Sequence, residues 1–183
     1  MDEIIVVDKD DNIIGVEEKE KCHDGEGILH RAFSIFVFNE MGELLIQQRS
    51  GLKKLWPLFW SNSCCSHPRL NEKFKEATEK RLGEELGITC PLKYIYKFRY
   101  KAKYTNQSSE NEVCSVFIGK LDNGDKINAN PEEVSNFKWT GIKELKENIV
   151  TNPERYTPWF KAECEELFGK YWSEIDNLFI SPN

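Results

Sequence analysis

The sequence predicts an α/β domain of the α+β kind, and three observations support that fold class. The chain has 183 residues, of which 39% are hydrophobic, enough for one sizeable core. Short runs rich in β-branched and aromatic residues recur along the chain, and segments with helical apolar spacing lie between and after them. Because no repeat, low-complexity tract or linker divides the chain, we expect one domain covering residues 1–183.

The charge balance excludes several classes of partner. Asp and Glu total 31 and Lys and Arg total 25, which gives a net charge of −6 at pH 7. Nucleic acids and anionic membranes favour clustered positive charge, and the sequence has no basic arm or block. The first residues lack a signal-peptide pattern, and no apolar run approaches the ~18 residues of a membrane helix. We therefore expect a cytoplasmic protein with no nucleic-acid, membrane or obligatory protein partner.

Strand patterns dominate the first fifty residues. Ile4–Val7 and Ile13–Val16 predict a hairpin, because the residues between them are turn formers. The charged, glycine-punctuated stretch Glu17–Gly27 predicts an irregular loop. Arg31–Phe38 is apolar and aromatic at successive positions, which indicates a strand buried on both faces, and a turn leads into a second strand, Leu44–Arg49.

The middle of the chain predicts a loop, a helix and two strands. Ser50–Trp60 mixes basic and aromatic residues without periodicity, as in a surface loop. Asn71–Leu86 has mostly helical apolar spacing and is followed by Gly87, a typical C-cap residue. Strands are expected over Leu92–Ala102 and Glu112–Gly119, joined by a polar turn.

The last part predicts one strand and two helices. The connection from residue 119 to 137 shows no informative pattern. Phe137–Thr140 indicates a short strand and Ile142–Asn148 a short helix. Thr157 and Pro158 favour a helix start, with a hydroxyl cap followed by proline in the first turn, and the apolar spacing continues to Ile175.

Cysteine and histidine usage points to a site in the first half of the chain. The six cysteines are Cys22, Cys64, Cys65, Cys90, Cys114 and Cys164. A reducing compartment argues against disulfides, which leaves metal binding, catalysis or burial. All three histidines lie in the first 67 residues, and two of them, His23 and His67, have a cysteine within two positions.

The helix expected over Asn71–Leu86 resembles the Nudix signature on its loop-helix-loop. Aligned on Gly87, Ser66 replaces the first glycine and Arg81 replaces a glutamate. The matching glutamates are Glu72, Glu84 and Glu85. Nudix hydrolases collect carboxylates around Mg²⁺ on this helix face, where positions 81 and 85 are one turn apart. Because arginine removes a hard oxygen ligand, we expect a site that holds a diphosphate without hydrolysing it.

Several further motifs occur in an order that can be compared with known families. They are Trp56-Pro57 with Trp60, Asn62 to Pro68, Phe98 to Ala102, Glu110 to Cys114, and Thr157 to Trp159. Together they resemble type 1 isopentenyl-diphosphate Δ-isomerase, a family of the Nudix superfamily, over about residues 4–172. The resemblance implies a Nudix-like α/β/α sandwich with a mixed central β-sheet, an additional N-terminal hairpin and a C-terminal helix. It also implies interconversion of isopentenyl and dimethylallyl diphosphate in isoprenoid precursor biosynthesis, with this small-molecule diphosphate as the partner.

The resemblance implies two metal sites. One is held by three histidines and two glutamates, which here are His23, His30, His67, Glu110 and Glu112. Nitrogen and oxygen donors in this ratio suit Mn²⁺ or Zn²⁺ better than Ca²⁺. The two glutamates are two positions apart, so a strand would point both carboxylates to one face. In the second site, Glu85 holds a Mg²⁺ that accompanies the diphosphate.

The implied reaction protonates C4 of the substrate to give a tertiary cation and removes a proton from C2. It needs an acid and a base on opposite sides of a flat substrate in a dry site. By the resemblance these are Cys65 and Glu112, with Tyr100 beside Glu112. We favour Glu112 as the donor and the Cys65 thiolate as the base, and the reverse assignment stays open. A buried thiol ionises only with help from positive charge or a metal.

The resemblance also assigns residues to the cation and to the diphosphate. Trp159 matches the aromatic residue that stabilises the cation. The residues that match the family's diphosphate-binding positions are Lys19, Arg49, Lys53 and Arg81. They would form a local positive pocket on an acidic protein. Lys54 is interpreted as a solvated side chain, and Cys64 as a small buried hydrophobe.

Two alternatives remain. A Nudix hydrolase acting on a nucleoside diphosphate derivative would release phosphate and tolerate Cys65→Ser. A structural zinc module built from cysteines and histidines would unfold without metal. Its ligands would be Cys22, His23, Cys64, Cys65 and His67. The zinc module is disfavoured, because two of these cysteines are adjacent and lack Cys-x-x-Cys spacing.

Overall fold

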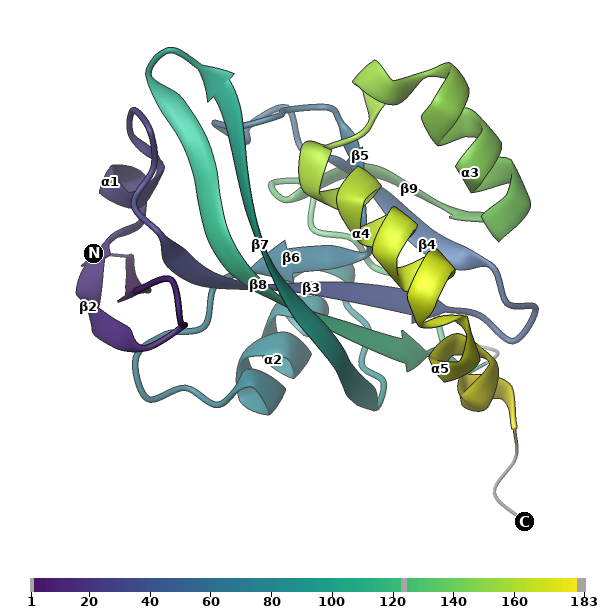
Figure 1. Cartoon of the computed structure of the whole chain (residues 1–183). Helices are drawn as coiled ribbons and strands as arrows, with labels where there is room; N and C mark the ends of the chain where they lie inside the picture. The colour runs from purple at the N-terminus through teal and green to yellow at the C-terminus, as the bar shows by residue number, and fades with distance from the viewer. Residues whose placement is uncertain (1, 123–124, 181–183) are drawn as a thin grey trace.

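A mixed β-sheet forms the centre of the computed structural model, which describes residues 2–122 and 125–180 (Figure 1). The strands are β1 (Glu3–Val7), β2 (Ile13–Glu18), β3 (His30–Phe38), β4 (Leu44–Arg49), β5 (Trp60–Ser61), β6 (Cys64–Ser66), β7 (Leu92–Thr105), β8 (Ser108–Lys120) and β9 (Val134–Thr140). The helices are α1 (Lys19–His23), α2 (Phe74–Leu86), α3 (Ile142–Thr151), α4 (Pro158–Lys170) and α5 (Trp172–Asp176), with 3₁₀ turns at Pro153–Arg155 and Asn177–Phe179.

Strand β3 organises the sheet. It pairs in parallel with β8 and antiparallel with β1, β4 and β6. The long strands β7 and β8 form a curved antiparallel hairpin that joins the sheet through β8, and β9 pairs with β4 (Figure 1). The mixed sheet with its flanking helices and its N-terminal β1–β2 hairpin confirms the predicted fold class.

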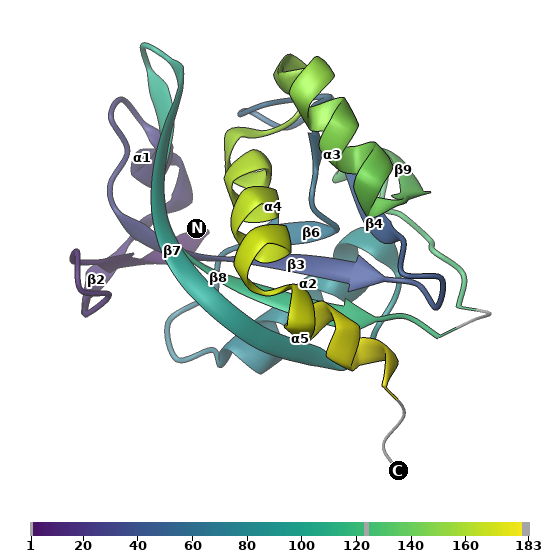
Figure 2. The same cartoon turned by 45° about the vertical axis from the view of Figure 1, so that its right-hand side comes forward.

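The sheet carries a hydrophobic core on each face, because successive side chains of β3 point to opposite sides. Phe36 and Phe38 pack with α4 residues such as Phe160. Phe33 and Ile35 pack on the other face, with α2 residues that include Leu82 and Leu86. Figure 2 shows α4 and α2 on opposite sides of β3. The prediction of a β3 strand buried on both faces is therefore confirmed, since residues 32–38 are all buried.

The irregular loop predicted over Glu17–Gly27 is wrong in its first half. Strand β2 continues to Glu18, which pairs with Glu3 of β1, and a short helix α1 follows. Cys22 of α1 is fully buried against Ile4 and Val6. This tertiary contact holds one helical turn that has too few residues to form alone.

The helix predicted over Asn71–Leu86 begins three residues later, at Phe74. Asn71 has φ = 65°, the left-handed region, which an α-helix cannot contain. The predicted C-cap is confirmed, because Gly87 has φ = 67° and its N–H donates to the Gly83 carbonyl at 2.9 Å. A Cβ at this position would also lie 2.9 Å from Asn128, so glycine permits a close approach of the chain.

Several other boundaries differ from the predictions, among them the end of β7 at Thr105, the start of β9 at Val134 and the end of α3 at Thr151. Strand β8 starts at Ser108 rather than Glu112, because polar residues continue the ladder with β7. The short strands β5 and β6 form within and after the predicted loop. The final helix starts at Pro158 as predicted but breaks at Tyr171 into α4 and α5, and the Thr157 hydroxyl lies 2.9 Å from Ser61 Oγ instead of capping the helix. In the described part of the chain, no helix has the length and apolarity to cross a membrane.

Candidate active site

A cavity of about 600 Å³ lies between the N-terminal segment, the loop after β4 and helix α4. One group of predicted site residues lines it with acid-base and metal-ligating side chains, namely His23, Cys65, His67, Tyr100, Glu110 and Glu112. Another group lines it with basic side chains and an indole, namely Lys19, Arg49, Lys53, Arg81 and Trp159. Two predicted residues, His30 and Glu85, are buried behind this lining.

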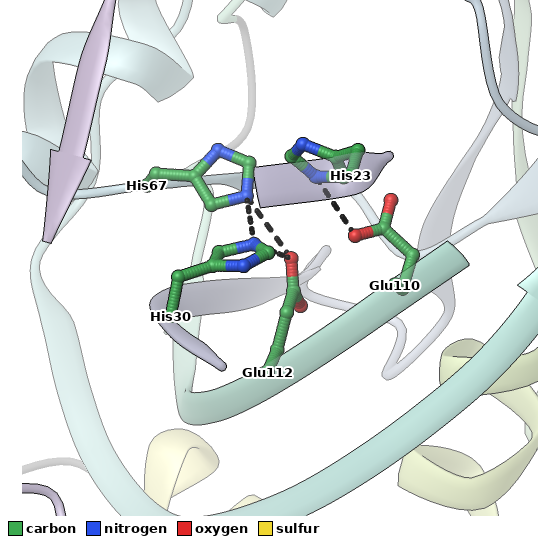
Figure 3. A group of neighbouring side chains, drawn as sticks. All are labelled: His23, His30, His67, Glu110 and Glu112. Carbon is green, nitrogen blue, oxygen red and sulfur yellow. Dashed lines mark hydrogen bonds and ion pairs between the residues drawn. The ribbon is translucent and has the colours of Figure 1, made fainter. Parts of the chain in front are cut away.

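Five potential metal ligands converge at one end of the cavity, from four parts of the fold (Figure 3). His23 ends α1, His30 begins β3, and His67 follows β6. Glu110 and Glu112 lie on β8, where Glu112 is the direct neighbour of His30. All five side chains are buried, and their ligand atoms lie within 4.8 Å of one another. The structure therefore brings the predicted histidines and glutamates together as one cluster.

Hydrogen bonds to the backbone set which ring nitrogens face the cluster. His23 Nδ1 lies 2.5 Å from the Lys19 carbonyl oxygen, and His30 Nδ1 lies 2.8 Å from that of Ile28. A carbonyl oxygen only accepts hydrogen bonds, so both Nδ1 atoms carry the hydrogen. In the neutral rings, each Nε2 then presents a lone pair to the cluster.

The lone pairs of His23 and His30 face carboxylate oxygens, and that of His30 also faces the Nε2 atom of His67. His23 Nε2 lies 2.9 Å from Glu110 Oε2. His30 Nε2 lies 3.2 Å from His67 Nε2 and 3.3 Å from Glu112 Oε1. Acceptors at such distances repel unless a cation or a proton lies between them, and histidines held by backbone carbonyls are typical of metal sites. The donor set thus fits a divalent cation.

Glu112 has a second partner that faces the cavity. Its Oε1 lies 3.0 Å from His67 Nε2, while its Oε2 accepts a hydrogen bond of 2.6 Å from the Tyr100 hydroxyl. The pairing of β7 with β8 places Tyr100 directly opposite Glu112. Burial, together with the Glu112 carboxylate, raises the pKa of Tyr100 well above its ordinary value. Tyr100 is therefore a neutral donor that orients the Glu112 carboxylate.

Cys65 lies on β6, across β3 from Glu112. It is the cross-strand neighbour of Ser34, while Glu112 neighbours His30, and these two β3 residues share one face of the sheet. Although Cys65 keeps some exposure to the cavity, burial raises the pKa of its thiol to about 12. Arg49 opposes this shift, with its Nη1 at 3.9 Å from Cys65 Sγ. The predicted positive neighbour of the thiol is therefore Arg49.

Arg49 joins the two ends of the cavity. Its guanidinium donates to the backbone carbonyls of Trp56 at 3.1 Å and Leu55 at 2.9 Å, which fixes its position. It also lies 5.2 Å from the ring centroid of Trp159. The Trp159 indole N–H donates to Asn62 Oδ1 at 3.3 Å, so the ring has one contact at its face and another at its edge.

Arg81 lies among three carboxylates. It donates to Glu84 at 2.7 Å, to Glu85 Oε1 at 2.6 Å and to Glu133 Oε1 at 3.1 Å. Although burial favours its neutral form, Glu85 and Glu133 raise the pKa of Arg81, so it stays charged. The other oxygen of Glu85 accepts from Gln47 Nε2 at 3.2 Å. Glu85 is thus paired on both oxygens and separate from the five-residue cluster.

The lysines differ in their surroundings. Burial, with Lys53 and Arg81 nearby, lowers the pKa of Lys19, and Asp2 lies 3.9 Å from its Nζ. Lys53 pairs with Glu133. Lys54 is exposed, as expected, and forms an ion pair with Glu20.

The proposed zinc-module ligands do not assemble. Cys64 is fully buried in the core beneath α2, as predicted for a small hydrophobe, and Cys22 packs against Ile4 and Val6. Neither belongs to the cluster around His67. The structural zinc interpretation is therefore wrong.

Two acids that contact other residues of interest are not predicted from the sequence, namely Glu133, which pairs with Lys53 and Arg81, and the buried Glu163, which lies beside Cys114. Glu133 lies in the connection that showed no informative pattern. Glu163 follows Trp159 by four residues, so both share a face of α4. This spacing is the one sequence feature that could have placed Glu163 near Trp159. The Glu133 contacts join segments far apart in the chain and leave no local pattern.

Comparisons with known proteins give the family of this chain. The sequence profile of the NUDIX domain matches residues 28–160. Isopentenyl-diphosphate Delta-isomerase 2 of Photorhabdus laumondii is 48% identical over 162 residues, covering 88% of this chain and 90% of that protein. Isopentenyl-diphosphate Delta-isomerase 1 of the same organism is 41% identical over 177 residues, covering 96% and 99%. The isopentenyl-diphosphate Delta-isomerase of Serratia proteamaculans is 40% identical over 168 residues, covering 91% and 92%.

Solved structures support the fold. DR0079 from Deinococcus radiodurans superposes with a TM-score of 0.68 at 18% identity, covering 97% of this chain and 99% of that one. The MutT protein from Methanosarcina mazei gives 0.58 at 17% identity, covering 81% and 94%. The resemblance inferred from the motifs is confirmed by the sequence relatives. The chain belongs to the isopentenyl-diphosphate Delta-isomerase family of NUDIX-domain proteins.

Proposed function

We propose that this protein interconverts isopentenyl diphosphate and dimethylallyl diphosphate for isoprenoid precursor biosynthesis. The observation that carries the proposal is a single cavity with Cys65, Glu112 and Tyr100 on its walls and four basic side chains beside them. A five-carbon diphosphate needs both kinds of surface, because its diphosphate is strongly anionic and its reacting carbons are apolar. Isomerisation also needs no redox group, only a proton donor and a proton acceptor.

In the proposed mechanism, Glu112 and Cys65 exchange protons with the substrate. The Glu112 carboxyl group donates a proton to C4, which gives the tertiary cation. The Cys65 thiolate then takes the proton from C2. In the reverse reaction the two groups exchange roles. Support comes from the Tyr100 hydrogen bond, which holds one Glu112 oxygen, and from Arg49, whose charge favours a thiolate at Cys65.

Trp159 is the proposed stabiliser of the cation. A cation over a desolvated indole face gains about 2 kcal/mol, which corresponds to roughly a 30-fold effect on rate. Trp159 is buried, and its ring lies 6.1 Å from that of Tyr100, beside the acid-base end of the cavity. Two aromatic walls would also exclude water from the cation.

Two metal sites belong to the proposal. The five-residue cluster would hold Mn²⁺ or Zn²⁺, as its nitrogen and oxygen donors favour. A divalent ion there would neutralise two buried carboxylates and keep Glu112 in one orientation. Glu85 would hold the Mg²⁺ that accompanies the diphosphate, while Lys19, Arg49, Lys53 and Arg81 bind the phosphate oxygens. A cytoplasmic location is also proposed, since a catalytic thiol at Cys65 must stay reduced.

The hydrolase alternative is not favoured, because Arg81 replaces a carboxylate that a hydrolase would use for Mg²⁺. A substrate panel separates the two functions. The purified protein is incubated with Mg²⁺ and either isopentenyl diphosphate or a nucleoside diphosphate sugar, and both dimethylallyl diphosphate and free phosphate are measured. We expect isomer and no phosphate. Phosphate release from the nucleotide without any isomer would refute the proposal.

A further inference from the structure

Glu133 joins two of the basic residues that face the cavity. Its Oε2 accepts a hydrogen bond from Lys53, and its Oε1 accepts one of 3.1 Å from Arg81 Nη2. Lys53 comes from the loop after β4, and Arg81 comes from α2. One carboxylate therefore links two phosphate-binding candidates that belong to different parts of the fold.

The backbone around Glu133 is attached to the same two parts. The Asn128 N–H donates to the Leu86 carbonyl at 2.8 Å, and the Asn130 N–H donates to the Glu85 carbonyl at 2.9 Å, which ties the segment to the end of α2. The Glu133 carbonyl accepts from the Ser50 N–H at 2.9 Å, which ties it to the start of the Lys53 loop. Glu133 is thus held by its main chain as well as by its carboxylate.

The charge of Glu133 is permanent. Its partial burial favours the neutral acid, but Lys53 and then Arg81 lower the pKa of Glu133 to about 2. Lys53 and Arg81 carry like charges beside Lys19, and after burial they also contribute to its lowered pKa, which Glu133 partly offsets. A fixed anion between two of these cations can hold them in place before an anionic ligand arrives.

We propose that Glu133 is a positioning residue of the diphosphate site, which aims the Lys53 ammonium and the Arg81 guanidinium at the same ligand. This inference rests on the proposed function for the nature of the ligand. Because the two cations are preorganised, the diphosphate binds without ordering two long side chains. The described side-chain contacts of Glu133 are with Lys53 and Arg81 and not with Cys65 or Glu112, so its effect falls on binding.

Calorimetry with inorganic pyrophosphate and Mg²⁺ tests the proposal without turnover. We expect Glu133→Gln to bind pyrophosphate ~10-fold more weakly than the wild type, as for other coupled charged groups. The matched control is Glu132→Gln, which removes the same charge from an exposed neighbour and should bind normally. Glu133→Asp, which keeps the charge, should recover part of the affinity. Unchanged or tighter binding by a folded Glu133→Gln protein would overturn the proposal, since tighter binding would make Glu133 a competitor of the diphosphate.

A double-mutant cycle tests whether Glu133 acts through the lysine. In a Lys53→Met background, Glu133→Gln should weaken pyrophosphate binding clearly less than it does in the wild type. An equal loss in both backgrounds would contradict the proposal. At saturating pyrophosphate, the Mg²⁺ concentration for half-saturation should stay unchanged in Glu133→Gln. A selective rise would make Glu133 a metal ligand and overturn its positioning role.

Kinetics on the same proteins separate this inference from the proposed function. With isopentenyl diphosphate, Glu133→Gln should raise KM with kcat nearly unchanged, the pattern of lost binding. A wild-type protein that binds pyrophosphate but yields no dimethylallyl diphosphate would refute the function and leave Glu133 in its role. A Glu133→Gln protein with the wild-type KM would refute the role alone.

Discussion

Glu112 on β8 and Glu163 on α4, which contacts β8, are both buried, but their neighbours differ. Glu112 on β8 is surrounded by donors and lone pairs from His30, His67 and Tyr100. Glu163 comes from α4 and meets Cys114, two residues after Glu112 on the same face of β8, with 3.7 Å between Glu163 Oε1 and Cys114 Sγ. The other Glu163 oxygen has no hydrogen-bond partner among the described residues.

The difference shows that burial alone does not mark a metal or catalytic site. A buried carboxylate must be paired or neutralised. Glu112 lies where lone pairs converge and a cation fits, whereas no basic side chain among the described residues forms an ion pair with Glu163. Burial, with a further contribution from Glu112, raises the pKa of Glu163 to about 8. Glu163 is therefore neutral at pH 7. It is neutralised by a proton, whereas Glu112 is placed to be neutralised by a metal ion.

The largest effect is expected on turnover. Glu112→Gln removes both the cavity-facing acid and a potential metal ligand, and kcat should fall by ~10²–10⁴-fold. Bound metal, measured on the purified protein by elemental analysis, should fall as well. Glu163→Gln is the matched control and should keep both the metal and the turnover. Equal losses of metal and turnover in the two variants would contradict the distinction between Glu112 and Glu163.

The next effect is on stability, and its sign follows from the pKa of Glu163. Between pH 4.5, the ordinary value, and about 8, the folded protein keeps the proton that the unfolded chain releases, so rising pH weakens folding. The groups that face Glu163 are Ser34 of β3, Glu112 and Cys114 of β8, Tyr96 of β7 and Cys164 of α4, and hydrogen bonding by Ser34 and Cys114 opposes the rise in its pKa.

Glu163→Gln should therefore match the wild type near pH 4 and be more stable by a few kcal/mol at pH 9, since a tenfold difference in proton affinity is worth about 1.4 kcal/mol. Urea unfolding at both pH values measures the difference. Glu165→Gln, an exposed neighbour on the same helix, should show no such gain. A stability difference between Glu163→Gln and the wild type that does not change with pH would contradict a neutral Glu163.

A smaller effect is expected at Trp159, which lies one helical turn before Glu163 on α4. A neutral Glu163 cannot stabilise the substrate cation, so we expect the Trp159 indole to do so. Trp159→Leu should then lower kcat by roughly 30-fold. Trp159→Phe, which keeps a π face, should lose less. Steady-state kinetics measure both, with pyrophosphate affinity as the check on the diphosphate end. A kcat for Trp159→Leu within roughly threefold of the wild type would assign Trp159 to packing alone.

The sequence predicts the parts of the fold that local patterns determine. Apolar residues at successive positions mark β3, and Gly87 marks the end of α2, because each signal lies within the element itself. Strands β5 and β6 have two and three residues and depend on pairing with distant segments, β5 with β4 and Tyr156 and β6 with β3. Helix α1 likewise depends on the burial of Cys22.

The candidate site divides in the same way. The histidines and glutamates of the cluster are found because they lie in motifs with recognisable order. Glu133 is missed because its partners, Lys53 and Arg81, are 80 and 52 residues away in the sequence. Ion pairs at such separations leave no local pattern, so only the folded chain shows that an acid holds the basic end of the cavity.

The most direct test of the isomerase function is incubation with isopentenyl diphosphate and Mg²⁺ in deuterated water, followed by NMR and mass analysis of the product. The wild type should form dimethylallyl diphosphate with deuterium in a methyl group derived from C4, because the added proton comes from an exchangeable enzyme group. The Cys65→Ala protein should form no dimethylallyl diphosphate, and C2 of the recovered isopentenyl diphosphate should carry no deuterium. Unchanged, unlabelled isopentenyl diphosphate after incubation with the metal-loaded wild-type protein would contradict the proposed function.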